Sequence, residues 1–290
     1  MSKPKVLVLR TAGTNCDLET SFAFELSGAK VELAHVNKLI DNEVKLDHYE
    51  ILAIPGGFSY GDDIASGKIL ANEIKYKLGE KLYKFASSGK PVIGICNGFQ
   101  VLVKMGILPK LNLVLDDDLK KDPSLGFKQS VTLTYNDSDK FESRWIYLKI
   151  DQNAKIKIQN FWLKGLPEII PLPVAHGEGK FVAKDSKVLA EIEKNSQVAF
   201  RYSDKNGALA AYPLNPNGAI NNIAGIFNDK GNILGLMPHP ERYIFKWQHP
   251  NRESVQIAKC KMQNKDKKET ADSECGWGLQ IFKNAVEQVK

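Results

Sequence analysis

The sequence predicts an α/β protein in which a mostly parallel β-sheet is flanked by helices. Over the first hundred residues, short apolar runs typical of buried strands alternate with segments of helical periodicity. The expected strands are residues 5–9, 30–36, 51–54 and 92–95. Strands separated by helices at this spacing form parallel sheets, and functional sites in such sheets lie beyond the carboxyl ends of the strands.

Two helices are expected between these strands, each with one apolar face toward the sheet. Asp17 can cap the first helix, which should end before Gly28. The spacing predicts that this helix packs through Leu18, Phe22 and Leu26. The second helix covers residues 72–87, and the residues predicted to face inward are Ile74, Leu78, Leu82 and Phe85.

The second half of the chain is richer in strand-like segments and turns. Strands are expected within 130–135, 145–150, 197–202, 222–227 and 232–241, followed by a last helix over 277–289. We predict a single domain over residues 1–290. The segment 247–274 is polar and rich in lysine, and because it lacks an apolar face we expect a surface insertion, either a loop or a short solvated helix.

Composition and charge narrow the class of protein. The chain has 290 residues, of which 43% are hydrophobic and 26% charged, a balance typical of globular proteins. Its net charge of +6 comes from basic residues interleaved with acids, which argues against a nucleic-acid-binding surface. No apolar run is long enough to span a membrane, and the N-terminus lacks the features of a signal peptide. Four scattered cysteines argue against a disulfide framework, so a cytoplasmic, reducing location is predicted.

A cysteine lies where the strand 92–95 is expected to turn into a helix. The residues from Gly94 to Gly98 form a G-x-C-x-G pattern around Cys96. This is the thiol counterpart of the nucleophile elbow, in which glycines permit a tight turn and the helix N-terminus favours a negatively charged nucleophile. The backbone N–H of Asn97 could then help to hold an oxyanion. The alternative interpretation is a buried cysteine that only fills the core.

A catalytic cysteine needs a base, and His239 is the main candidate. It ends an apolar strand and is followed by Pro240 and Glu241, and residues two apart on extended backbone point to the same side. Glu241 is therefore expected to hold one ring nitrogen while the other faces the thiol. The competing base is His176, which has Glu178 two residues further on.

The other histidines and the glycine-rich loop suggest no metal site and no phosphate site. His35, His48 and His249 lie in charged or turn surroundings and are interpreted as surface residues, and the histidines and cysteines form no metal-binding pattern. Residues 55–68 are rich in glycine, but their spacing differs from that of a phosphate-binding loop. The backbone N–H of Gly57 is instead a candidate second donor to an oxyanion.

Together these motifs resemble one family closely. The segments GICNGFQ (94–100) and HPE (239–241) look like the catalytic motifs of class I glutamine amidotransferases. Within that class, PGGFSYGDD, PVAHGEGKF, LMPHPER and GTNCDLE resemble the glutaminase subunits of phosphoribosylformylglycinamidine synthase. The resemblance covers most of residues 3–244 and the last helix. Residues 247–274 look longer than the corresponding family loop. Residues 111–127 do not resemble a segment of the family.

The resemblance implies a flavodoxin-like class I glutamine amidotransferase fold, with an antiparallel portion added to the mostly parallel sheet. It also implies that this chain hydrolyses glutamine through a cysteine thioester. The implied site consists of the catalytic residues Cys96, His239 and Glu241, the oxyanion-hole residues Gly57 and Asn97, and the substrate-binding residues Gln100 and His176.

The resemblance further implies a partner. Ammonia would pass to a separate synthetase subunit, with or without a small third subunit, which uses ATP and Mg to convert formylglycinamide ribonucleotide to its amidine in de novo purine synthesis. No cofactor or metal is implied for this chain itself, nor any nucleic acid or membrane. Two other classes stay open on the sequence: a cysteine peptidase or hydrolase of related α/β fold, and a non-catalytic subunit that retains the fold.

Overall fold

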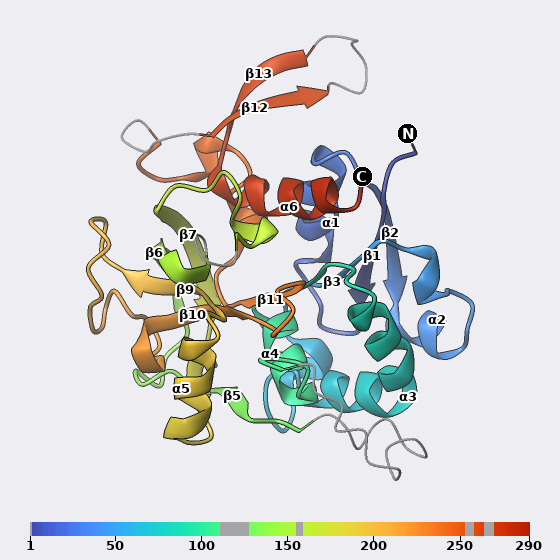
Figure 1. Ribbon diagram of the computed structural model, residues 1–290, viewed down its shortest axis with the longest axis horizontal. Coiled ribbons are helices and arrows are strands. Elements are labelled where there is room, and N and C mark those ends of the chain that lie inside the picture. Colours follow the sequence, from blue (N-terminus) through green and yellow to red (C-terminus); the bar gives the residue numbers. More distant parts are fainter. Residues whose placement is uncertain (1, 111–127, 155–158, 253–257, 264–269) are drawn as a thin grey trace.

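A nine-stranded mixed sheet forms the centre of the molecule, in the strand order β2-β1-β3-β4-β11-β10-β9-β6-β7 (Figure 1). The computed structural model describes residues 2–110, 128–154, 159–252, 258–263 and 270–290, and of residues 258–263 and 270–274 only the backbone. The predicted fold class, a mostly parallel sheet flanked by helices with an added antiparallel portion, is confirmed as a mixed sheet flanked by helices.

One half of the sheet is parallel. It consists of β2 (Lys30–His35), β1 (Lys5–Arg10), β3 (Ile51–Ile54), β4 (Val92–Ile95) and β11 (Ile233–Leu236). The central strands β3, β4 and β11 are buried along their whole length, as expected for parallel strands that are covered on both faces.

The other half of the sheet is antiparallel. It continues from β11 through β10 (Ile223–Phe227), β9 (Val198–Ser203), β6 (Glu142–Ile150) and β7 (Ile169–His176). A separate antiparallel pair is formed by β5 (Val131–Thr134) and β8 (Lys180–Ala183). The chain therefore returns from the antiparallel half to place β11 beside β4, and this return brings the second half of the sequence to the Cys96 turn.

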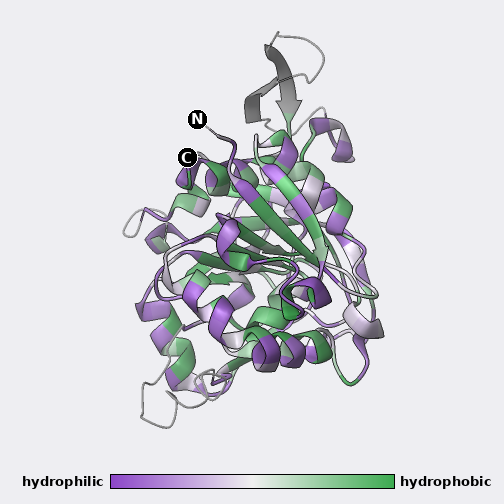
Figure 2. Ribbon diagram, turned by 90° about the vertical axis from the view of Figure 1, so that its right-hand side faces the viewer, coloured by the Kyte–Doolittle hydropathy of each residue, from purple (hydrophilic) through white to green (hydrophobic). Residues whose placement is uncertain are grey.

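Helices cover both faces of the sheet. α1 (Asp17–Leu26) and α6 (Trp277–Gln288) pack together on one side, and α3 (Lys68–Ser87) and α4 (Asn97–Met105) pack together on the other (Figure 1). Two shorter helices are α2 (Val36–Ile40) and α5 (Ser186–Lys194). Hydrophobic residues concentrate on the central strands (Figure 2), so the core lies between the sheet and these helices.

Of the three residues predicted to face inward on the first helix, Leu26 packs against the core, but Leu18 and Phe22 do not. Leu18 and Phe22 are 69% and 46% exposed, whereas Ala23 and Phe24 are buried. Phe24 makes an edge-to-face contact with Phe282 of α6, with 4.9 Å between the ring centroids. The contact with a distant helix selects the buried face, and helical spacing alone does not contain that information.

His249 is buried and not at the surface, contrary to the prediction. Its ring packs 4.4 Å from Trp145 on β6 and 5.7 Å from Tyr243, measured between ring centroids. The polar surroundings of His249 in the sequence suggested exposure, but two aromatic rings from elsewhere in the chain cover it.

The predicted insertion contains a β-hairpin and not a loop or a solvated helix. β12 (Ala258–Gln263) pairs antiparallel with β13 (Thr270–Cys275), and the hairpin projects from the body of the molecule (Figure 1). Strand pairing satisfies backbone groups without needing an apolar face, so a polar sequence can form it. Cys275 is disulfide-bonded. The segment 111–127 and residues 253–257 and 264–269 of the insertion lie outside the described residues.

Candidate active site

The sheet brings the two predicted catalytic segments to one edge. β11 runs parallel to β4 with Leu236 opposite Ile95, and the N–H of Cys96 donates to the carbonyl of Leu236 at 2.8 Å. Cys96 follows β4 directly, and His239 follows β11 by three residues. Both residues therefore leave the sheet at the carboxyl ends of neighbouring parallel strands, where sites in such sheets form.

Cys96 has the backbone conformation of a nucleophile elbow. Its φ of 50° and ψ of −106° lie outside the regions that ordinary L-residues adopt, and it occupies the N-cap position of α4. Gly94 and Gly98 make the turn possible. A Cβ on Gly98 would lie 1.8 Å from the Ile54 carbonyl oxygen, and one on Gly94 would lie 2.6 Å from the Gly98 oxygen. The G-x-C-x-G pattern thus reflects close packing of α4 against β3 at Gly98 and against β4 at Gly94.

His239 and Glu241 form a buried, hydrogen-bonded pair. Nδ1 of His239 lies 2.6 Å from Oε1 of Glu241, and both residues are 1% exposed. The sequence suggested that extended backbone would bring them together. The structure instead has a 3-10 turn over Pro240–Arg242. Burial opposes protonation of the ring, but Glu241 and Cys96 outweigh it and raise the pKa of His239 above its ordinary value. Nε2 is buried and has no hydrogen-bond partner among the described residues, so it is free to exchange a proton with a reacting group.

Gly57 and Asn97 are the two residues predicted to supply backbone N–H groups to an oxyanion. Asn97 is the first residue of α4, where an amide has no partner within the helix. Gly57 has a φ of 142°, and a Cβ there would lie 2.7 Å from the backbone nitrogen of Asn15. Backbone hydrogen bonds join this loop to the β1–α1 turn, and their N–H donors are Asn15, Cys16, Phe58 and Tyr60. The role of Gly57 and Asn97 as oxyanion donors stays a prediction.

Gln100 lies one turn into α4 and ties this helix to the loop after β7. Its side-chain N–H donates to the backbone carbonyl of Glu178, and its side-chain oxygen accepts from the side-chain Nδ2 of Asn97 at 3.0 Å. The residue is 3% exposed. Both ends of the Gln100 amide are therefore used in holding the site together, and its predicted contact with substrate stays a prediction.

His176 ends β7 and is not arranged like His239. Its Nδ1 lies 3.1 Å from the side-chain oxygen of Asn136. Glu178 does not pair with it, because the Glu178 carboxylate accepts from the Ser66 N–H at 3.2 Å and lies 3.7 Å from Lys104. Burial, with the neighbouring His239, lowers the pKa of His176 to about 3. His176 is therefore a neutral residue, and the geometry favours His239 as the base.

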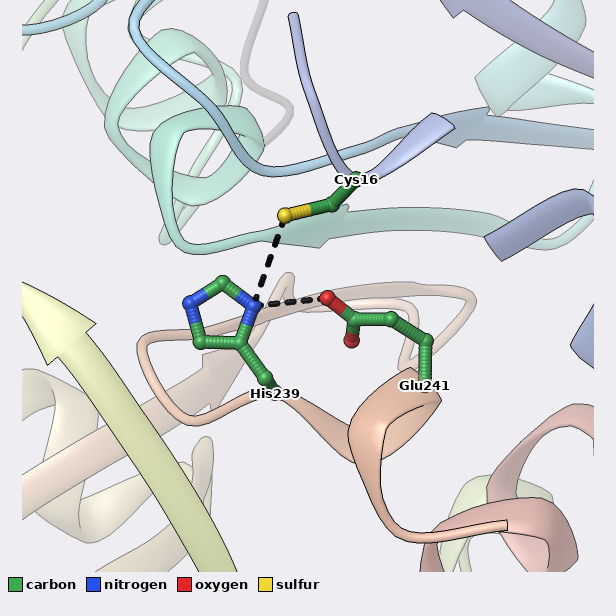
Figure 3. A group of neighbouring side chains, drawn as sticks. All are labelled: Cys16, His239 and Glu241. Carbon is green, nitrogen blue, oxygen red and sulfur yellow. Dashed lines mark hydrogen bonds and ion pairs between the residues drawn. The ribbon is translucent and has the colours of Figure 1, made fainter. Parts of the chain in front are cut away.

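Cys16 is a site neighbour that sequence reasoning missed. It is the N-cap residue of α1, the place predicted for Asp17, and its sulfur lies 3.9 Å from Nδ1 of His239 (Figure 3). The side chain is buried, and burial raises the pKa of its thiol despite the hydrogen bond to His239. One signal could have found it: Cys16 follows the carboxyl end of β1, at the same edge of the sheet as Cys96.

The ligand atoms of Cys16, His239 and Glu241 all lie within 4.8 Å of one another, a spacing at which side chains can share a metal ion. The arrangement does not fit one. Nδ1 already bonds Glu241, and an N–H of the Arg242 guanidinium donates to the Cys16 sulfur at 3.1 Å. The positively charged guanidinium would repel a metal ion bound beside it. The three side chains are therefore better described as a hydrogen-bonded network.

Comparison with known proteins agrees with the geometry. The model of the CobB/CobQ-like glutamine amidotransferase domain matches residues 3–289. The chain belongs to the PurQ family of glutamine amidotransferases. The phosphoribosylformylglycinamidine synthase subunit PurQ of Dehalococcoides mccartyi is 44% identical over 99% of this chain and 98% of its own length. The PurQ subunit of Methanococcus maripaludis strain C7 is 41% identical over 98% of this chain and 97% of its own length.

A solved structure shows the same relationship. A chain in the structure of PurLQS from Thermotoga maritima is 27% identical to this one and superimposes with a TM-score of 0.68, and the match covers 100% of both chains. The PurQ family assignment thus holds over the whole fold. Within the residues that the structure describes, no helix is both long and apolar enough to cross a membrane.

Proposed function

We propose that this chain is the glutaminase subunit of a phosphoribosylformylglycinamidine synthase, and that Cys96, His239 and Glu241 carry out its chemistry. The observation that carries the proposal is the convergence of a strained cysteine elbow with a buried His–Glu pair at one edge of the sheet. A nucleophile, a base and a group that orients the base are what amide hydrolysis through a covalent intermediate requires.

The first half of the reaction forms a thioester. The Cys96 thiolate attacks the side-chain carboxamide carbon of glutamine, and the oxygen that becomes negative accepts hydrogen bonds from the amides of Gly57 and Asn97. His239 then donates a proton to the leaving nitrogen, and ammonia departs. Glu241 keeps the ring oriented and supports its positive charge while it carries the extra proton.

The second half regenerates the enzyme. Neutral His239 removes a proton from water as the water attacks the thioester, and the carbon–sulfur bond breaks to release glutamate and the Cys96 thiolate. The net reaction consumes glutamine and water and produces glutamate and ammonia. The buried position of His239 and Glu241 keeps bulk water away from the pair and strengthens their interaction.

The released ammonia is used by a separate synthetase subunit, which binds the ribonucleotide, ATP and Mg. The PurLQS structure, in which a similar chain occurs, supports an assembly of this kind. The chemistry assigned to this chain needs no metal or cofactor of its own. We therefore expect glutamine hydrolysis by the complex to survive removal of divalent cations, and amidine formation to stop.

The proposal is tested with an electrophilic glutamine analogue that alkylates the attacking thiol. The analogue should modify Cys96 stoichiometrically, and Cys96→Ala should lose both labelling and glutamine hydrolysis while its circular dichroism spectrum stays unchanged. Glutamine should protect the wild-type chain. Labelling of another cysteine, or near-normal ammonia release by Cys96→Ala, would overturn the assignment. Cleavage of peptides and not of glutamine would instead favour a peptidase.

A further inference from the structure

Arg242 lies beside the catalytic pair, and among the described residues the hydrogen bond and the ion pair of its guanidinium go to Cys16 and Glu19. One of its N–H groups donates to the sulfur of Cys16 at 3.1 Å, and its Nε lies 3.9 Å from a carboxylate oxygen of Glu19. Glu241 is the residue next to Arg242 in the chain, and its Oε2 is buried with no hydrogen-bond partner among the described residues. A buried carboxylate oxygen without a partner is a strong acceptor. The nearby guanidinium could therefore bond the Glu241 carboxylate in competition with His239.

Cys16 is well placed to restrain this competitor, because the structure fixes the sulfur from several directions. The thiol donates to the side-chain oxygen of Asn15 at 3.2 Å, which leaves its lone pairs for Arg242. The backbone N–H of Cys16 donates to the carbonyl of Gly56 at 3.2 Å. A Cβ on Gly56 would lie 3.2 Å from the Cys16 sulfur and 2.9 Å from Cε1 of His239. The Cys16 thiol and the His239 imidazole therefore both pack against the backbone of Gly56.

We propose that Cys16 is a positioning residue for the catalytic base: its sulfur holds Arg242 away from Glu241, so that the Glu241 carboxylate remains committed to His239. The inference rests on the proposed roles of Cys96 and His239. It assigns a task to the GTNCDLE segment, whose cysteine takes no part in the proposed reaction. The Cys16 thiol acts through Arg242 and Glu241 and does not exchange a proton with substrate.

Pairing of Arg242 with Glu241 would change the pH dependence of the site in a definite direction. The titratable and charged groups that face His239 are Glu241 on its own turn, Cys96 after β4, Cys16 before α1 and His176 at the end of β7, with Arg242 behind Cys16. If Arg242 paired with Glu241, the carboxylate would support the imidazolium less. The pKa of His239 would fall, and reactivity that depends on protonated His239 would change at a lower pH.

The test measures the rate of Cys96 alkylation by iodoacetamide as a function of pH, with the Cys96 peptide quantified by mass spectrometry. Four full-length proteins are compared: wild type, Cys16→Ala, Cys16→Ser and the double variant Cys16→Ala/Arg242→Gln. Cys16→Ala should shift the profile to lower pH by about one unit, which corresponds to a tenfold change in the proton equilibrium. Glutamine hydrolysis should fall about tenfold in kcat, with KM unchanged.

The other two variants separate positioning from simple packing. A serine hydroxyl can still accept from Arg242 and donate to Asn15, so Cys16→Ser should keep the wild-type pH profile. Removing the guanidinium in the double variant should return the profile of Cys16→Ala toward wild type. A profile that Cys16→Ala leaves unchanged, or a shift that the double variant retains, overturns the inference. A wild-type Cys96 that shows no titrating reactivity at all would instead count against the proposed function.

Discussion

At the residue scale, the chemistry of each histidine in the site depends on the hydrogen-bond partners of its two ring nitrogens. His239 has a carboxylate on Nδ1 and an unpartnered Nε2, which is the arrangement of a base. His176 has an amide oxygen near Nδ1 and no carboxylate partner, because Glu178 bonds the Ser66 amide. Two His-x-Glu segments that look alike in the sequence therefore have different chemistry.

We expect the two histidines to differ sharply in a single-turnover assay of thioester formation. His239→Ala should slow this step by about 10²–10⁴-fold, the usual loss for a general acid–base group. His176→Ala should change the step far less, because the lowered pKa of His176 keeps the ring neutral and unsuited to proton exchange near neutral pH. The assignment of the base fails if both variants lose thioester formation equally.

At the scale of elements, the elbow depends on contact between α4 and β3. A Cβ on Gly98 would lie 1.8 Å from the carbonyl oxygen of Ile54, a backbone atom that cannot move aside without shifting β3. The nucleophile, the Asn97 amide and the first turn of α4 are therefore positioned by one close approach between a helix and a strand.

We expect Gly98→Ala to destabilise the fold by about 1–3 kcal/mol, the range for overpacking a tight contact, and to reduce glutamine hydrolysis. Gly177→Ala is the matched control, since a Cβ there would have its nearest neighbour at 4.0 Å and its φ is not positive. The control should change the free energy of unfolding, measured in urea, by less than about 0.5 kcal/mol. Equal stability of the two variants would show that the elbow tolerates the extra carbon.

A second prediction at this scale concerns the β12–β13 hairpin, which projects from the body of the molecule (Figure 1). Its segment carries Lys259, Lys261, Lys265, Lys267 and Lys268. If the segment docks on an acidic face of the synthetase subunit, replacing all five by Gln should slow association, most strongly at low salt, and leave glutamine hydrolysis unchanged. Association rates measured by surface plasmon resonance across a salt series decide this. Identical rates would leave the hairpin as a neutral addition.

For the whole molecule, the buried His176 links global stability to pH. Burial lowers its pKa in the folded chain from the ordinary value of 6.5 to about 3. Between these values the unfolded chain binds a proton that the folded chain excludes. The contribution of neutral His176 to stability is therefore complete above pH 6.5 and is lost progressively as the pH falls toward 3.

His176→Asn should remove this source of acid sensitivity. The free energy of unfolding of the wild type should fall relative to that of the variant by about 1.4 kcal/mol per pH unit within this window, or about 2 kcal/mol between pH 7 and pH 5. Urea denaturation at the two pH values measures the difference. Parallel pH profiles for wild type and variant would mean that His176 does not titrate as the structure indicates.

The local elements and the candidate nucleophile could be predicted from the sequence alone. Apolar runs marked the strands, and glycine spacing marked the Cys96 elbow, because a backbone turn and the periodicity of a strand or helix are encoded over a few neighbouring residues. Packing between distant segments instead set which face of α1 is buried, that His249 is covered by aromatic rings, and that Glu178 bonds Ser66 and not His176. It alone brought Cys16 to 3.9 Å from Nδ1 of His239, across a separation of 223 residues. Such contacts are set by how strands and helices pack over long distances in the chain, and no local pattern of residues contains that information.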